Sequence, residues 1–161
     1  MALLLEETLR DLLHLQKLTL VCAESCTGGL VSHRITNVPG SSEYFMGGVV
    51  AYSYEAKAAL LDVSWDTLNS AGAVSEETVR EMARGARKLF ESDIAVSVSG
   101  IAGPSGGTPE KPIGTTWLGL SATDGEWARH FIWNGDRERN KLDSSTMALQ
   151  FVVDYLEGKL G

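Results

Sequence analysis

The sequence predicts an α/β fold: a three-layer α/β/α sandwich with a mixed, mostly parallel sheet that includes an antiparallel hairpin. Short apolar runs alternate with segments of helical spacing, which is typical of strands covered by helices on both faces. An Asp-Gly turn within 123–126 joins two strand-like runs and predicts the hairpin. A length of 161 residues suits one ordinary core. We therefore expect a single domain over residues 1–161.

Periodicity and turn residues place the elements of the first half of the chain in order. They predict a helix over 2–16, a strand over 18–21, a helix over 30–35, a strand over 45–52 and helices over 55–61 and 64–71. Gly47 and Gly48 predict a bulge or a close backbone approach within the second strand.

In the second half, Ser75 is a predicted helix cap and the helix that follows it runs to about Phe90. Its apolar face is expected to consist of Val79, Met82, Ala83, Ala86 and Leu89. Then come strands over 94–98, 115–122 and 127–133, and a last helix that opens over 135–140 with Asp136 as its cap.

Composition excludes several classes of protein. The net charge is −7 and neither half contains a basic run, which disfavours nucleic acid as a partner. No segment has the ~20 apolar residues of a membrane span, and acidic residues interrupt the first helix as no signal peptide permits. We expect a cytoplasmic protein without membrane contact.

Cys22 and Cys26 have neither zinc nor redox spacing, so we expect buried free thiols.

The segment 22–29, Cys-Ala-Glu-Ser-Cys-Thr-Gly-Gly, connects the first strand to a short helix. A residue at such a turn lies at a helix N-terminus, which favours a phosphate or an oxyanion. Ser25 is either a nucleophile with a base elsewhere in the chain, or a helix cap like Thr27. Cys26 is a weaker candidate nucleophile, because no histidine stands where the sequence would pair it.

Lys57 falls in the first turn of the 55–61 helix, where the helix dipole disfavours a cation and makes the amine more available as a base. The alternative is a solvated surface lysine. Arg137 and Arg139 stand at the start of the last helix, where they either bind an anion or balance the neighbouring Asp136 and Glu138 in solvent.

The segment 99–114 contains five of the 17 glycines and three of the four prolines. Long irregular segments in compact domains are more often functional than not, and we expect a substrate-binding loop rather than a flexible surface connection. Ser99, Thr108 and Lys111 are its candidate contacts to a polar ligand.

Six motifs together resemble the CinA C-terminal-domain family of nicotinamide-nucleotide amidases, in its stand-alone form without the additional N-terminal domain of the larger CinA proteins. The motifs lie at 23–29, 38–42, 48–57, 73–75, 100–104 and 106–115. Two positions depart from the family pattern: Tyr54 stands where Asn is usual, and Ser99 where many members have Thr.

The resemblance implies an enzyme that converts nicotinamide mononucleotide and water to nicotinate mononucleotide and ammonia. It implies Ser25 as nucleophile, Lys57 as base and Tyr52 as an assisting hydrogen-bonding group. In the mechanism that we expect, backbone N–H groups around Cys26 to Gly28 hold the oxyanion. The competing hypothesis is a non-catalytic nucleotide- or phosphate-binding module of the same fold.

We expect the pyridine nucleotide to be the small-molecule partner, the chain to form a homo-oligomer, and the reaction to need neither a cofactor nor a metal. The predicted substrate-binding residues are Cys26, Thr27, Gly28, Gly29, Gly48, Ser99, Gly100, Thr108, Arg137 and Arg139.

Overall fold

A computed structural model describes residues 4–160 and contains one five-stranded sheet in the order β2-β1-β3-β4-β5. The strands are β1 (Leu20–Glu24), β2 (Phe45–Val50), β3 (Ile94–Gly100), β4 (Thr115–Ala122) and β5 (Gly125–Ile132). β1 is parallel to both β2 and β3, whereas β3–β4 and β4–β5 are antiparallel. Only β4 therefore runs against the other four strands, and the predicted mixed, mostly parallel sheet with a hairpin is confirmed.

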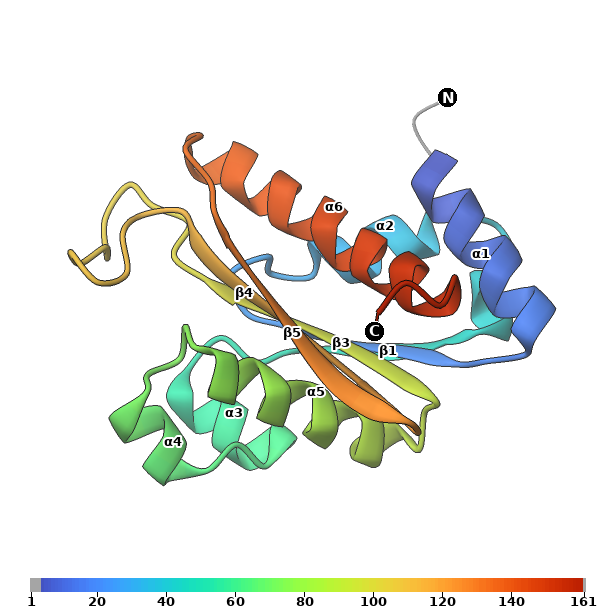
Figure 1. Ribbon diagram of the computed structural model, residues 1–161, viewed down its shortest axis with the longest axis horizontal. Coiled ribbons are helices and arrows are strands. Elements are labelled where there is room, and N and C mark those ends of the chain that lie inside the picture. The colour runs from blue at the N-terminus through green and yellow to red at the C-terminus, as the bar shows by residue number, and fades with distance from the viewer. Residues whose placement is uncertain (1–3, 161) are drawn as a thin grey trace.

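Helices cover both faces of the sheet (Figure 1). One face carries α1 (Leu4–Gln16), α2 (Leu30–Thr36) and α6 (Arg137–Leu156); the other carries α3 (Tyr54–Leu61), α4 (Trp65–Ser70) and α5 (Glu76–Phe90). A short 3₁₀ helix, Ser41–Glu43, precedes β2 and was not predicted. Positions 2 and 3 of the predicted first helix lie outside the described residues.

Alternation along β1 divides its side chains between two cores, because successive strand residues point to opposite faces. Leu20 and Cys22 belong to the apolar cluster beneath α1 and α6. Val21 and Ala23 belong to the cluster beneath α3 and α5. The same alternation sends Glu24 toward α2 and Ser25 toward α3.

Several element boundaries differ from the predicted ones. β1 continues through 22–24, which the sequence had assigned to the turn, because these residues pair with β2 and β3 on both sides. β2 ends at Val50 rather than at 52, and the predicted bulge is confirmed by a register shift at Met46. Leu89 is 56% exposed, so its predicted inward position is wrong; Phe90 packs against Gly47 in its place.

Capping side chains fix where the helices begin. Ser75 accepts a hydrogen bond from the N–H of Thr78, and Asp136 accepts one from the N–H of Arg139, which confirms both predicted caps. Ser53 caps α3 in the same way, and this cap sets Lys57 at the end of the first turn.

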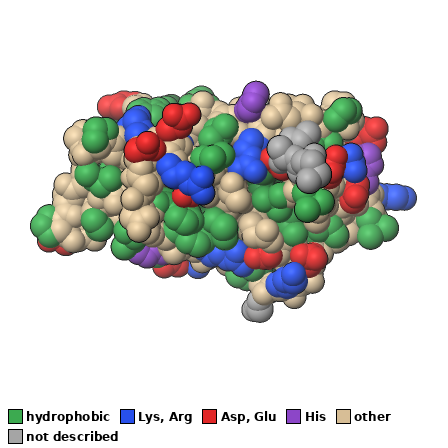
Figure 2. All heavy atoms as spheres, turned by 90° about the horizontal axis from the view of Figure 1, so that it is seen from above, with side chains coloured by type: hydrophobic (Ala, Val, Ile, Leu, Met, Phe, Trp, Pro, Cys, Tyr) green, Lys and Arg blue, Asp and Glu red, His purple; other side chains and the backbone are tan. Residues whose placement is uncertain are grey.

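The surface above α1, α2 and α6 carries basic and acidic side chains intermixed (Figure 2). None of the helices in the described part of the chain is both long and apolar enough to cross a membrane.

Candidate active site

Ser25 and Lys57 meet where the carboxyl ends of β1 and β2 lie side by side. The Nζ atom of Lys57 lies 2.9 Å from the Oγ atom of Ser25. Ser25 is 7% exposed and Lys57 is 1% exposed, so the pair is nearly closed to solvent. Of the two alternatives for Lys57, the solvated surface lysine is therefore excluded.

The main chain after β2 holds the Lys57 amine in this place. Its Nζ donates hydrogen bonds to the carbonyl oxygens of Ala51, at 2.9 Å, and Tyr52, at 3.3 Å. Burial disfavours the charged ammonium and lowers the pKa of Lys57 from 10.5 to about 8. A neutral amine beside a serine hydroxyl is thus available near neutral pH, which is what a general base requires.

Glu24 lies on the face of β1 opposite to Lys57, and its side chain binds the start of α2. Its carboxylate accepts hydrogen bonds from the N–H groups of Gly29, Val31 and Ser32 and from the hydroxyls of Thr27 and Ser32. Neither Ser25 nor Thr27 is the cap: the N-cap residue is Gly29, whose φ of 104° suits glycine. Glu24 occupies three N–H groups at this helix end, so these three are not available to a phosphate.

Backbone N–H groups at the Ser25 turn differ in whether they have a partner within residues 4–160. The N–H of Gly28 donates to the carbonyl oxygen of Ser25, so it is not available for an oxyanion. The N–H groups of Cys26 and Thr27 donate to no other described residue. These two groups are the candidate oxyanion donors.

Both cysteines are free and buried, as predicted. Burial raises the pKa of Cys26 to about 11, which keeps its thiol protonated and argues against Cys26 as the nucleophile. Its Sγ lies 3.2 Å from where a Cβ at Gly100 would be, so Gly100 makes room for Cys26 beside the site.

A cavity of about 680 Å³ opens between the Ser25 turn and α6. Thr27, Gly28 and Gly29 line one side of it, and Arg137 and Lys141 lie on the other. The Nζ of Lys141 lies 3.8 Å from where a Cβ at Gly28 would be, and it donates to no partner within residues 4–160. Lys141 was not predicted as a site residue, and only its helical spacing of four from Arg137 could have indicated it.

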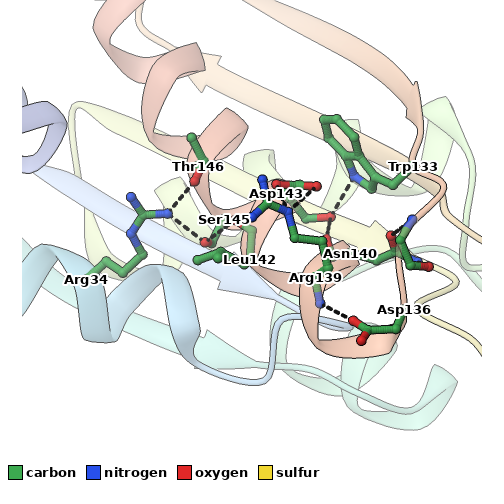
Figure 3. Close-up of polar contacts among 11 residues, drawn as sticks. Arg34, Trp133, Asp136, Arg139, Asn140, Leu142, Asp143, Ser145 and Thr146 are labelled. Atoms are coloured by element: carbon green, nitrogen blue, oxygen red, sulfur yellow. Dashed lines mark hydrogen bonds and ion pairs between the residues drawn. The ribbon is translucent and has the colours of Figure 1, made fainter. Parts of the chain in front are cut away.

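The two predicted arginines point to different places. Arg137 faces the cavity and donates to the carbonyl oxygen of Gly103 and to the hydroxyl of Tyr52. Arg139 turns to Asp143, 3.1 Å away on the same helix (Figure 3). The hydroxyl of Tyr52 therefore contacts Arg137, and the carbonyl of Tyr52 contacts Lys57.

Three other predicted residues have contacts within the protein. Gly48 gives room to Ser32, since a Cβ there would lie 2.3 Å from the Ser32 hydroxyl oxygen. The hydroxyl of Ser99 donates to the carbonyl oxygen of Ala73. Thr108 is exposed in the long loop and accepts a hydrogen bond from the N–H of Lys111. Within the described residues, none of these contacts involves Ser25 or Lys57.

The loop over 101–114 is tied down at both ends, which argues against a slack connection. Lys111 donates to the carbonyl oxygen of Ala71. Asn140 of α6, which is buried and was not predicted, donates to the carbonyl oxygen of Ala102.

In the described residues, His, Cys, Asp and Glu do not gather in groups of three that could hold a metal ion.

Comparison with known proteins places this architecture in a family. The CinA C-terminal domain matches residues 3–156. A CinA-like protein of Thermotoga sp. is 50% identical over 155 residues, which cover 96% of this chain and 38% of that protein. A CinA-like protein of Geotalea uraniireducens is 54% identical over 134 residues, covering 83% of this chain and 32% of that protein. The chain thus spans well under half the length of these relatives.

Solved structures agree in fold. A competence-damaged protein (CinA) superfamily protein from Klebsiella pneumoniae superposes with a TM-score of 0.92 at 32% identity and covers 96% of both chains. A competence/damage inducible protein from Agrobacterium tumefaciens gives 0.90 at 35% identity and covers 95% of both chains. The chain belongs to the CinA C-terminal domain family.

Proposed function

We propose that this protein is a nicotinamide-nucleotide amidase that deamidates nicotinamide mononucleotide with Ser25 as nucleophile and Lys57 as base. The observation that carries the proposal is the 2.9 Å contact between a buried lysine amine and a buried serine hydroxyl. A serine hydroxyl attacks an amide only when a base takes its proton, and a lysine of lowered pKa is such a base.

In the proposed reaction, the neutral Lys57 amine takes the Ser25 proton while Oγ attacks the carboxamide carbon. The oxyanion that forms accepts hydrogen bonds from the N–H groups of Cys26 and Thr27. Lys57 returns the proton to the leaving nitrogen, the C–N bond breaks, and ammonia departs from the ester formed on Ser25. A water molecule then gives its proton to Lys57 while its oxygen attacks the ester carbon. The bond from that carbon to Ser25 Oγ breaks, Lys57 returns the proton to Oγ, and nicotinate mononucleotide is released.

The nucleotide phosphate would bind in the cavity beside the Ser25 turn, between Arg137 and Lys141. Arg137 offers a planar pair of donors and Lys141 an ammonium without a partner in the described residues. Arg139 is less suited, because Asp143 already neutralises it. Tyr52 would assist by steadying Arg137 through its hydroxyl and Lys57 through its carbonyl.

The first test is ammonia release from nicotinamide mononucleotide by the purified protein and by Ser25→Ala and Lys57→Ala. Each variant should lose at least about 10²-fold in kcat, because nucleophile or base is removed. The exposed residues Ser42 and Lys88 provide matched controls, and Ser42→Ala and Lys88→Ala should keep wild-type rates.

Calorimetric titration of Ser25→Ala with nicotinamide mononucleotide separates binding from chemistry. Binding by this variant together with ammonia release by the wild type supports the amidase. Binding without ammonia release by the wild type would instead establish the non-catalytic nucleotide-binding module.

A further inference from the structure

We propose that Glu24 is a positioning residue for the proposed reaction: its buried carboxylate fixes the turn that presents Ser25 to Lys57. The inference rests on the proposed function, but it concerns a residue on the opposite face of β1 from Lys57. Glu24 is 1% exposed at the end of a central strand, with Val50 and Val98 as its neighbours on either side.

The contacts of Glu24 surround the segment that follows Ser25. Oε1 accepts hydrogen bonds from the Thr27 hydroxyl at 2.6 Å, the Val31 N–H at 3.0 Å and the Gly29 N–H at 3.2 Å. Oε2 accepts from the N–H of Ser32 at 2.9 Å and from its hydroxyl at 2.8 Å. One side chain thus ties the end of β1 to the start of α2, through the N–H groups of Gly29, Val31 and Ser32.

These contacts bear directly on Ser25 because it lies between Glu24 and the segment that Glu24 binds. A turn closed on both sides cannot rotate its middle residue without breaking hydrogen bonds to a buried carboxylate, which is costly. The same turn carries the N–H groups of Cys26 and Thr27, so the nucleophile and the proposed oxyanion donors are held together. A misplacement of about 1 Å at a reacting group can cost about 10²-fold in rate.

The five donors around Glu24 require an acceptor at both terminal atoms of its side chain. A carboxylate presents acceptors on both oxygens, whereas glutamine replaces one of them with an NH₂ donor. Whichever way that amide turns, at least two of the five donors would face it. Glu24→Gln therefore removes two or three of the five contacts with almost no change in volume.

Gly48 extends the same arrangement to β2. A Cβ at Gly48 would lie 2.3 Å from the Ser32 hydroxyl oxygen, so Gly48→Ala must displace the side chain that donates to Glu24. Gly48 itself contacts neither Ser25 nor Lys57 in the structure. Because the shortest contact of that Cβ would be with the Ser32 hydroxyl, we expect an effect of Gly48→Ala on catalysis to pass through Ser32 and Glu24.

The test measures kcat, KM and thermal stability for Glu24→Gln, with Glu6→Gln as its matched control. Glu6 is also a buried glutamate, 3% exposed, but it pairs with Arg34 in the last turn of α2 rather than the first. We expect Glu24→Gln to lower kcat by about 10- to 100-fold and to change KM by a smaller factor, because Thr27 and Gly29 also line the cavity. Glu6→Gln should lower the melting temperature while kcat stays within about twofold of the wild type.

A second readout does not need the nucleotide. A fluorophosphonate reacts with an activated serine, forming a P–O bond to Ser25 and expelling fluoride while Lys57 takes the proton. The rate of Ser25 labelling, followed by mass spectrometry, should fall in Glu24→Gln as kcat does. If the wild type labels at Ser25 but releases no ammonia, nicotinamide mononucleotide is not its substrate. The labelling rates of the wild type and Glu24→Gln then test the positioning role by themselves.

A double-mutant cycle keeps the proposal testable if Glu24→Gln does not fold. Gly48→Ala should lower kcat and the labelling rate, and it should add little in a Ser32→Ala background, where the clashing oxygen is gone. Three results would overturn the positioning role. The first is a folded Glu24→Gln variant whose kcat stays within about twofold of the wild type, and the second is an equal loss of kcat in Glu6→Gln. The third is additive effects of Gly48→Ala and Ser32→Ala on kcat. Absence of both labelling and ammonia release in the wild type would overturn it together with the proposed function.

Discussion

Lys57 occupies a place where an amine is held by two carbonyl oxygens and a hydroxyl rather than by a carboxylate. No negative side chain among these contacts offsets the cost of burying its charge, and the pKa of Lys57 falls to about 8 for that reason. The residue is therefore charged at low pH and neutral at high pH within the range in which enzymes are assayed.

The pH dependence of the reaction should follow this titration. We expect kcat/KM to rise about tenfold per pH unit below pH 8 and to level off above it, because only the neutral amine accepts the Ser25 proton. Initial rates of ammonia release between about pH 6 and 9.5 would check this. A profile that is flat through pH 8, or one whose midpoint lies near the ordinary 10.5 of lysine, would contradict the assignment of Lys57 as base.

The arginines at the start of α6 make a second prediction at the scale of residues. Arg137→Gln should raise KM for nicotinamide mononucleotide by about 10- to 100-fold, the value of a charged hydrogen bond to phosphate. Arg139→Gln is the matched control and should change KM less than about twofold, because Arg139 pairs with Asp143 instead.

Nicotinamide riboside, which lacks the phosphate, gives the internal check on Arg137. Wild type and Arg137→Gln should process it with equal KM values. A loss on the riboside as large as the loss on the nucleotide would assign Arg137 another role.

At the scale of elements, the position of Lys57 depends on how closely α3 approaches α5. Gly85 permits the approach: a Cβ on it would lie 1.8 Å from the carbonyl oxygen of Leu61, at the end of α3. Leu61 is one helical turn from Lys57, so a displacement of Leu61 also moves the Lys57 amine.

Gly85→Ala should therefore destabilise the protein by about 1–3 kcal/mol through overpacking, although alanine is the better helix former by about 1 kcal/mol. It should also lower kcat. Urea denaturation would measure the stability, with the exposed Leu89→Ala on the same helix as a control expected to change it by less than about 0.5 kcal/mol. A higher urea midpoint for Gly85→Ala would refute the close contact.

At the scale of the whole molecule, the lowered pKa of Lys57 couples the site to global stability. Between about pH 8 and 10.5 the unfolded chain binds the Lys57 proton and the folded chain does not, so stability from this group rises with pH. Below about pH 8 both states bind the proton, and the buried charge is a constant penalty. The lowering of the Lys57 pKa from 10.5 to about 8 corresponds to at most about 3 kcal/mol in the free energy of unfolding.

Comparison with Lys57→Met isolates this contribution. The free energy of unfolding of the wild type minus that of Lys57→Met should increase from pH 8 to pH 10.5, and should stay constant from pH 6 to pH 7.5. Denaturation curves at these pH values would check it. A difference that falls as pH rises would mean that Lys57 is held as an ammonium in the folded protein.

The sequence alone determined the features that depend on near neighbours in the chain. Apolar periodicity predicted the helices and strands, since each must bury one face, and Asp-Gly predicted the hairpin between β4 and β5. The caps at Ser75 and Asp136 were predictable because a cap binds backbone only two or three residues ahead. The turn between the first strand and the helix that follows Ser25 was predictable for the same local reason.

Only the tertiary structure decided which side chains meet. Ser25 and Lys57 are 32 positions apart, and their contact exists because parallel β1 and β2 end at the same edge of the sheet. Arg137 and Arg139 have different partners because they lie on different faces of α6. The five donors to Glu24 likewise gather on the face of β1 that is turned toward α2. Burial and pKa shifts are set by segments distant in sequence, and a local pattern therefore cannot supply them.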